Sequence, residues 1–294
     1  MLLSSSAGKV EKNNRMAGEK EKKRLDVLLV EKNIFPTRSR ARAEIMAGNV
    51  FVNGKKSDKP GSLTPILANI DLHKPANPYV SRGGLKLKKA LDEFRIDLKG
   101  KIVLDIGAST GGFTQCALDN GAEKVYALDV GYGQLAWVLR NHPRVVNMER
   151  FNVRFLKKED LSPMPHLAVI DVSFISLEKV LPVVAQLGIN EVICLIKPQF
   201  EAPRSQVGKK GVVKDKEVHE KVLEKVVKLS LDLFYRVEGI TFSPLKGPKG
   251  NIEFLLYLLY DGVRAIQPGD KLHGGLQCLI REVVLEAHSC LKKN

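Results

Sequence analysis

Apolar and polar positions divide the chain into stretches with different periodicity. Residues 1–21 are polar and rich in Lys, Glu and Ser, so we expect a disordered extension. Residues 22–76 carry a few short apolar clusters, which indicate a small α+β domain. A linker is predicted at 77–84, and residues 85–262 alternate short apolar runs with helical patterns. That alternation is typical of a doubly wound, mainly parallel α/β sheet. A helical tail is expected at 263–294.

The small domain shows helix and hairpin signals. Leu25, Leu28 and Leu29 fit one face of a short helix. Thr37 is suited to cap a second helix, from Arg38 to Ala47, which Gly48 would end. The dipeptide Asn53-Gly54 follows an apolar run and predicts a tight β-hairpin.

In the larger domain, seven apolar runs predict strands. They are Lys101–Leu104, Lys124–Leu128, Val145–Asn147, Leu167–Ile170, Glu191–Ile196, Tyr235–Phe242 and Glu253–Leu259. The last two have no helix between them, so an antiparallel hairpin is expected at one edge of the sheet. Helical patterns separate most of the others, as at Val218–Leu231, and another spans Leu276 to Leu291 in the tail.

Charge adds a prediction about partners. The 294-residue chain has 47 Lys and Arg against 33 Asp and Glu, a net charge of +14, which favours a polyanionic partner such as nucleic acid. Half of that excess lies in residues 1–60. Basic side chains would supply affinity through phosphates rather than read sequence; a solvated charged surface is the alternative. The candidates are Arg24, Arg38, Arg40, Arg42, Lys55 and Lys56, with Arg82 in the second domain.

A glycine-rich loop follows the first strand of the larger domain. Residues 104–114 read Leu-Asp-Ile-Gly-Ala-Ser-Thr-Gly-Gly-Phe-Thr. The next strand ends at Asp129, 22 residues after Gly107, where an acid can accept hydrogen bonds from a ribose diol. A ligand with a ribose is therefore expected at this edge of the sheet, although a ligand-free turn remains possible from the spacing alone.

The loop does not suit a phosphate. A P-loop needs Lys and Ser or Thr after its last glycine, but Phe113 stands there. A dinucleotide loop needs a middle glycine, which is missing, and Asp105 would repel pyrophosphate while attracting a cation. S-adenosylmethionine, with a sulfonium, an ammonium and a ribose, fits these features. The expected binding residues are Asp105, Gly107, Ser109, Gly111, Gly112, Phe113 and Asp129, with Asn152 and Asp160 toward the adenine.

Four ionisable residues stand at the boundaries of predicted elements. Asp171 and Lys197 close strands, Glu253 opens one, and Lys86 lies where the chain enters the larger domain. Because carboxyl ends of adjacent parallel strands face one crevice, Asp171 and Lys197 should approach the same ligand as Asp105. Singly, each could be a solvated charge at a strand end. Together they could hold a hydroxyl group and stabilise the charge that develops on its oxygen.

Several motifs make a family resemblance specific. They are Val50-Phe-Val-Asn-Gly-Lys, Tyr79-Val-Ser-Arg-Gly-Gly, Asp105-Ile-Gly-Ala-Ser-Thr-Gly-Gly-Phe-Thr, Asp171-Val-Ser-Phe-Ile-Ser-Leu, Lys197-Pro-Gln-Phe-Glu and Gly250-Asn-Ile-Glu-Phe. With them, residues 22–262 resemble the TlyA family, often named hemolysin A, which joins an S4 RNA-binding domain to an FtsJ-like ribose methyltransferase.

The resemblance implies a Rossmann-like class I methyltransferase sheet, S-adenosylmethionine as methyl donor, and a Lys-Asp-Lys-Glu catalytic set at Lys86, Asp171, Lys197 and Glu253. It further implies methylation of the 2′-hydroxyl of a cytidine in 23S ribosomal RNA and, in some members, in 16S RNA. Ribosomal RNA or subunits would be the partner, with no obligatory protein partner.

Other functions remain to be weighed. The family's older name suggests a membrane-lytic protein, yet the most apolar run, Ile252 to Tyr260, is nine residues long and contains Glu253. An RNA-binding factor with an inactive methyltransferase fold is a second alternative. A third is methylation of a base or of a protein. Base amino-methylation usually needs an Asn/Asp-Pro-Pro-Tyr-like loop, and Asp171-Val-Ser-Phe stands there instead. The four cysteines lack metal-site or disulfide spacing, so we expect free thiols, no metal and a cytoplasmic location.

Overall fold

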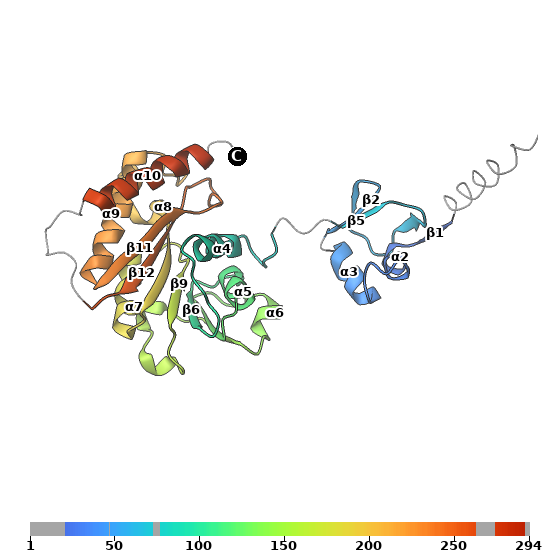
Figure 1. The fold of residues 1–294 in the computed structure, drawn as a ribbon, viewed down its shortest axis with the longest axis horizontal. Coiled ribbons are helices and arrows are strands. Elements are labelled where there is room, and N and C mark those ends of the chain that lie inside the picture. Colours follow the sequence, from blue (N-terminus) through green and yellow to red (C-terminus); the bar gives the residue numbers. More distant parts are fainter. Residues whose placement is uncertain (1–20, 47, 73–76, 263–273, 292–294) are drawn as a thin grey trace, which may run out of the picture. The chain divides into compact units, whose positions relative to one another are not determined.

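The computed structural model describes residues 21–46, 48–72, 77–262 and 274–291, which fall into two units (Figure 1). The division lies after Pro78, and each unit is compact by itself. The predicted extension at 1–21 lies almost wholly outside the described residues, and so does the first part of the predicted tail. The predicted linker, 77–84, belongs from Tyr79 onward to the larger unit.

The smaller unit has two small antiparallel sheets and two helices. Its elements are β1 Lys22–Arg24, α2 Leu25–Glu31, α3 Arg38–Met46, β2 Val50–Val52, β3 Lys55–Ser57, β4 Leu63–Pro65 and β5 Ile70–Leu72. Strand β2 lies between β3 and β5, and β1 pairs with β4.

Local signals in the smaller unit explain its short elements. Thr37 Oγ1 accepts a hydrogen bond from the Arg40 backbone N–H at 3.2 Å, which confirms the predicted N-cap. Asn53 and Gly54 have φ of +49° and +74°, the left-handed pair that a type I′ hairpin turn requires. The core that these elements cover consists of Leu25, Leu29, Ala41, Ile45 and Val50.

The larger unit is built on a seven-stranded sheet with the order β11-β12-β10-β9-β6-β7-β8. Its strands are β6 Ile102–Ile106, β7 Lys124–Asp129, β8 Val145–Glu149, β9 Leu167–Ile170, β10 Glu191–Ile196, β11 Tyr235–Phe242 and β12 Phe254–Tyr260. Neighbours from β10 to β8 are parallel, whereas β12 is antiparallel to both β10 and β11. This confirms the doubly wound sheet with an antiparallel pair at one edge.

Helices cover both faces of this sheet. One face packs on α4 Gly83–Glu93, α5 Gly112–Asp119 and α6 Trp137–Arg140, and the other on α7 Leu181–Leu187, α9 Lys216–Asp232 and α10 Gly274–Cys290. The remaining turns are α8 Pro198–Glu201, η1 Val153–Phe155, η2 Lys158–Asp160, η3 Leu177–Lys179 and η4 Arg204–Gln206. Helix α10 confirms the helical pattern of the tail, and it packs on α9 and β11 rather than apart from the sheet.

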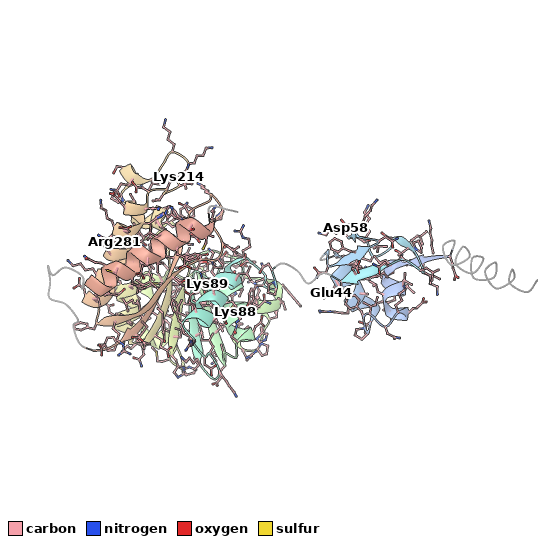
Figure 2. All side chains as sticks on the ribbon, turned by 45° about the horizontal axis from the view of Figure 1, so that its top comes forward. Glu44, Asp58, Lys88, Lys89, Lys214 and Arg281 are labelled. Atoms are coloured by element: carbon pink, nitrogen blue, oxygen red, sulfur yellow. The ribbon has the colours of Figure 1, made fainter. Side chains whose placement is uncertain are left out.

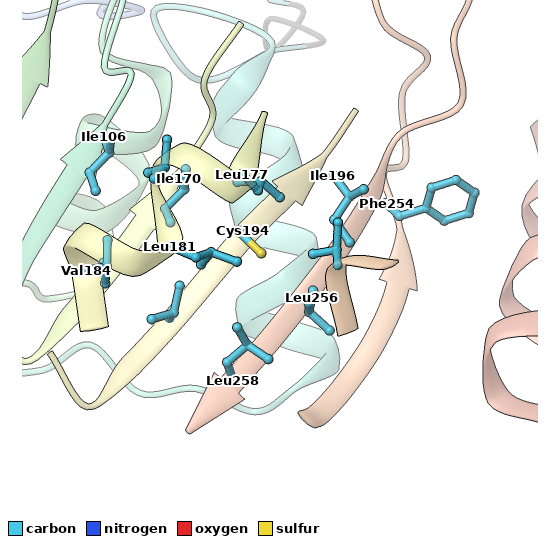
Figure 3. Close-up of a cluster of buried hydrophobic side chains, with 14 of the residues drawn as sticks. Ile106, Ile170, Leu177, Leu181, Val184, Cys194, Ile196, Phe254, Leu256 and Leu258 are labelled. Carbon is cyan, nitrogen blue, oxygen red and sulfur yellow. The ribbon is translucent and has the colours of Figure 1, made fainter. Parts of the chain in front are cut away.

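Burial on both faces explains why the parallel strands are continuous apolar runs. Alternate residues of a strand point to opposite faces, so Leu104 and Ile106 join the core under α7 and α9 while Val103 joins the core under α4 and α5. Figure 3 shows Ile106 and Ile170 from two of the parallel strands beside the helix that carries Leu181.

The strand order reverses beside β6. After β6 the chain adds β7 and β8 on one side, and then returns to place β9 and β10 on the other. In open α/β sheets, ligands bind outside the carboxyl ends of the strands at such a reversal. The loops after β6 and β9 therefore mark where a site is expected.

Candidate active site

A cavity of about 300 Å³ lies at the carboxyl ends of β6, β9 and β10. Its walls come from five segments far apart in sequence. They are Ser81 to Lys86, the glycine loop from Gly107 to Phe113, Asp171 with Ser173, Lys197, and Lys246 to Glu253. The fold thus brings the glycine loop and all four ionisable candidates to one cavity.

Two short ion pairs lie in the wall of this cavity. Lys86 Nζ is 2.6 Å from Glu253 Oε2, and Lys197 Nζ is 2.6 Å from Asp171 Oδ1. Glu253 is 1% exposed, and both lysines are below 10%. Lys86 comes from the first turn of α4, Asp171 and Lys197 directly follow β9 and β10, and Glu253 directly precedes β12. Because buried charges must be paired, each lysine holds its partner carboxylate in place, and each carboxylate holds its lysine.

Three neighbours that we did not single out from the sequence support these pairs. Lys197 Nζ also donates to Ser173 Oγ at 2.9 Å, and Gln199 Nε2 donates to Glu253 Oε1 at 3.4 Å. A Cβ at Gly247 would lie 2.5 Å from Glu253 Oε1, so a side chain there would displace that carboxylate. Ser173 and Gln199 each stand two residues after a charged candidate, which was the only signal available.

The glycine loop packs tightly against its surroundings. Gly111 has a φ of +99°, and a Cβ there would lie 2.3 Å from Leu139 Cδ1. A Cβ at Gly112 would lie 2.2 Å from Ser81 Oγ. Phe113, 3% exposed, follows in the first turn of α5 and lines the cavity. Packing therefore favours glycine at both positions, and Gly112 presents bare backbone to the cavity.

Asp105 lies inside β6 rather than after it, contrary to the expected strand end at Leu104. Its carboxyl group is fully buried and accepts a hydrogen bond from Thr114 Oγ1 at 2.6 Å, while Oδ1 is buried without a partner. Burial raises the pKa of Asp105 to about 7. Asp105 does not line the cavity in the structure and lies beneath the glycine loop.

Asp129 ends β7 and shapes the loops around it. One carboxylate oxygen accepts the Ser109 backbone N–H at 2.8 Å, and the other accepts that of Gly131 at 2.7 Å. Ser109 is exposed, with a φ of +48°, and lines the cavity. Asp129 thus holds the glycine loop and the loop after β7 together at the carboxyl edge of the sheet.

The two residues expected toward the adenine have local roles in the structure. Asn152 Oδ1 accepts the Arg154 backbone N–H at 3.1 Å, so it caps η1. Asp160 Oδ2 accepts the Lys157 backbone N–H at 2.9 Å at η2. Neither lines the cavity, so their contact with a ligand stays a prediction.

The basic candidates of the smaller unit are partly engaged. Arg24 and Arg38 both pair with Asp26, at 3.0 and 2.9 Å, and the Arg24 hydrogen bond helps to hold the pKa of this buried carboxyl at about 2. Arg40 pairs with Glu44 at 2.6 Å. Arg42, Lys55 and Lys56 are exposed. In the larger unit, Arg82 is exposed at the cavity rim and donates to the Lys246 carbonyl at 2.8 Å.

These features fit S-adenosylmethionine. Asp105 Oδ1 is a buried acceptor without a partner, but Asp105 does not line the cavity, so its contact with the ammonium group stays a prediction. The glycine loop offers open backbone, and Asp129 stands at the end of the neighbouring strand, where ribose hydroxyls would lie. Among the described residues, no helix is long and apolar enough to cross a bilayer, and no cluster of side chains has the arrangement of a metal site.

Comparison with known proteins decides the family. The model of the FtsJ-like methyltransferase family matches residues 79–260, and that of the S4 domain matches residues 23–63. The chain belongs to the FtsJ-like methyltransferase family. As an FtsJ-like enzyme it takes S-adenosylmethionine as its methyl donor, and its S4 domain lies in the smaller unit.

Relatives over most of the chain place it in the TlyA (hemolysin A) branch of FtsJ-like proteins. YqxC of Bacillus subtilis is 50% identical over 93% of this chain and 96% of its own. A 16S/23S rRNA (cytidine-2′-O)-methyltransferase, TlyA of Mycobacterium tuberculosis, is 42% identical over 83% and 92%. A solved structure from Streptococcus thermophilus is 44% identical, with a TM-score of 0.69 over 93% of this chain and 98% of its own.

Proposed function

We propose that this protein transfers the methyl group of S-adenosylmethionine to the ribose 2′-hydroxyl of a cytidine in 23S ribosomal RNA, with 16S RNA as a further substrate to test. The observation that carries the proposal is the convergence of two buried ion pairs, Lys86–Glu253 and Lys197–Asp171, on the cavity that the glycine loop lines. TlyA of Mycobacterium tuberculosis and TlyA of Campylobacter jejuni are named as rRNA cytidine-2′-O-methyltransferases, which supports the choice of substrate.

Lys197 is the residue we assign to the hydroxyl group. As an ammonium it has three N–H groups, of which one faces Asp171 and one donates to Ser173. The third can donate to the 2′-oxygen and stabilise the negative charge that develops as the hydroxyl proton passes to solvent water. A neutral amine acting as a base would lose the attraction of Asp171. We therefore assign Lys197 to charge stabilisation and Asp171 to its orientation.

Lys86 and Glu253 form the second half of the catalytic set. Their ion pair lies in the same cavity wall, and Gly247 leaves room for the Glu253 carboxylate. We assign this pair to holding the ribose in line, because its two charges are fixed by burial and offer both a donor and an acceptor to sugar hydroxyls. The methyl donor supplies an electrophilic carbon when bound, and these residues supply the orientation.

The residues we assign to the methyl donor lie along one edge of the sheet. Asp105 would accept from its ammonium group, Gly107, Gly111 and Gly112 would offer close backbone approach, and Asp129 would accept from its ribose. Ser109 and Phe113 complete this wall. Asn152 and Asp160 remain candidates toward the adenine.

Label transfer tests this function. The enzyme is incubated with tritiated S-adenosylmethionine and ribosomal RNA from a strain that lacks it. We expect label in 23S RNA with the wild type and loss of nearly all label with Lys197→Ala. The matched control is Lys221→Ala, an exposed lysine of α9. An enzyme that binds S-adenosylmethionine by calorimetry but labels no ribosomal RNA or subunit would instead be an RNA-binding factor with an inactive methyltransferase fold.

A further inference from the structure

A second hollow, of about 650 Å³, lies next to the active-site cavity in the larger unit. Its walls come from residues 206–215 and from residues 246–250. Five lysines and one acid line it: Lys209, Lys210, Lys214, Lys246, Lys249 and Asp215. The acid is already engaged, because Asp215 accepts the Glu217 backbone N–H at 2.9 Å as the N-cap of α9.

Four of the five lysines in this hollow form no ion pair with another described residue. Lys209, Lys210, Lys214 and Lys249 are exposed, and none forms an ion pair with another residue in the part of the chain that the structure describes. Figure 2 shows Lys214 at the surface of the larger unit. Because the lysines outnumber the single acid, Asp215, they repel one another, and this cost is recovered when a polyanion binds.

One buried side chain fastens the two loops together. Asn251, 2% exposed, accepts the Val213 backbone N–H and donates to the Gly211 carbonyl, each at 2.9 Å. The backbone carbonyl of Asn251 accepts a hydrogen bond from the Gly247 N–H at 2.9 Å. A Cβ at Gly211 would lie 3.6 Å from Lys249 Nζ, so that lysine reaches across to the opposite loop. The lysines are therefore held on a prearranged surface, which lowers the entropic cost of binding.

The hollow adjoins the active-site cavity. Lys246 lines both, and Gly247 and Pro248 continue from it along the cavity wall to Glu253. A polymer whose reacting sugar lies beside Lys197 would therefore extend over the lysines. Phosphate is the group that recurs along an RNA strand on both sides of a ribose, and lysine binds it as a point charge.

We propose that this lysine-lined hollow binds the phosphates of the RNA strand that flanks the target nucleotide. The proposal rests on the function proposed above and adds a binding surface to it. Lys210 and Lys249 both line the hollow, Lys249 reaches toward the turn that Asn251 fastens, and their ammonium groups would contact phosphate oxygens.

The test compares two double variants of the full chain. Lys210→Gln with Lys249→Gln removes two charges from the hollow. Lys99→Gln with Lys158→Gln removes two exposed lysines near the amino ends of the strands, beside Gly121 and Gly188. The dissociation constant for an unmodified 23S RNA transcript is measured over a range of potassium chloride concentrations. The affinity for S-adenosylmethionine is measured in parallel and should be unchanged in both.

We expect the hollow variant to lower the slope of log affinity against log salt by roughly 1.4 to 1.8, since each lost phosphate contact contributes about 0.7 to 0.9. Its KM for RNA should rise while kcat is retained. A slope equal to that of the control variant would overturn the proposal, even where the wild type methylates the transcript. A defect confined to whole subunits would also overturn it, because it would indicate an acidic protein surface. Absence of methylation by the wild type would instead reject the proposed function.

Discussion

Gly107 lies directly against the backbone of Asp171. A Cβ built at Gly107 would lie 2.7 Å from the Asp171 carbonyl oxygen and 3.0 Å from its carbonyl carbon. The φ of Gly107 is +89°, so the backbone there also favours glycine. The loop assigned to the methyl donor and the strand end that carries Asp171 are therefore in contact through main chain, so a substitution in one should displace the other.

Alanine substitutions at Gly107 and Gly100 should lower stability by similar amounts but differ in their effect on methyl transfer. Gly107→Ala adds a methyl group against Asp171, whereas Gly100→Ala places one at a φ of +72° with nothing within 4 Å. Each should cost about 1–2 kcal/mol of unfolding free energy from left-handed backbone alone. We expect methyl transfer to fall sharply only in Gly107→Ala, as measured by label incorporation. Equal activity in the two variants would show that the contact with Asp171 does not matter.

Removal of one member of the Lys86–Glu253 pair should both destabilise the fold and abolish methyl transfer. Lys86→Met leaves the Glu253 carboxylate buried without its cation, a change that typically costs about 3–5 kcal/mol. The double variant Lys86→Met with Glu253→Gln should recover most of that stability in denaturant unfolding, because no unpaired charge remains. Methyl transfer should stay lost in the double variant. Recovery of activity with stability would mean that the pair is only structural.

The affinity for S-adenosylmethionine should depend on the ionisation of Asp105. Burial raises its pKa to about 7, and an ammonium group binds the ionised form. As pH falls below 7 the carboxylate is lost, so the dissociation constant should rise by nearly tenfold per unit. Calorimetry across this range should show weaker binding by Asp105→Asn, with a flatter pH profile. An unchanged slope in the variant would remove Asp105 from the binding site.

A buried histidine pair joins α9 to α10 and should make stability pH-dependent. His219 Nδ1 is 2.9 Å from His288 Nε2, and His219 is fully buried. Burial, with the neighbouring His288, lowers the pKa of His219 to about 4. The unfolded chain takes up this proton near pH 6.5 and the folded chain only near 4. The contribution of neutral His219 to the unfolding free energy is therefore fully present above pH 6.5. It is lost as pH falls toward 4, and the loss is at most about 3 kcal/mol.

The difference in unfolding free energy between wild type and His219→Gln isolates this effect, since groups such as Asp105 contribute to both. We expect the unfolding free energy of the wild type to fall relative to that of His219→Gln as the pH is lowered from 7 to 5. A difference that is constant with pH would show that His219 does not titrate in this range.

Much of the fold followed from sequence because its signals are local. The parallel strands are buried on both faces, so Ile102 to Leu104 and Val192 to Ile196 read as apolar runs with little ambiguity. Asn53-Gly54 and Thr37 predicted a turn and a cap from the needs of single residues. Lys197 and Asp171 were expected at one crevice because parallel strands present their carboxyl ends together.

The remaining features depend on partners that are distant in sequence. Asp105 was expected at the end of a strand, but its register with Ala127 and Val169 places it within the sheet. Nothing in the sequence indicated that Asp26 would engage two of the arginines expected to bind RNA. Asn251 was visible only as part of a motif, and its role in fastening residues 211–213 depends on tertiary packing.

The measurement that tests the central claim most directly is nucleoside mass spectrometry of 23S RNA treated with the enzyme. After complete digestion, the account predicts 2′-O-methylcytidine with the wild type and with Lys221→Ala, and its absence with Lys197→Ala. A methyl group on the base, or 2′-O-methylcytidine formed by Lys197→Ala at the wild-type rate, would contradict it.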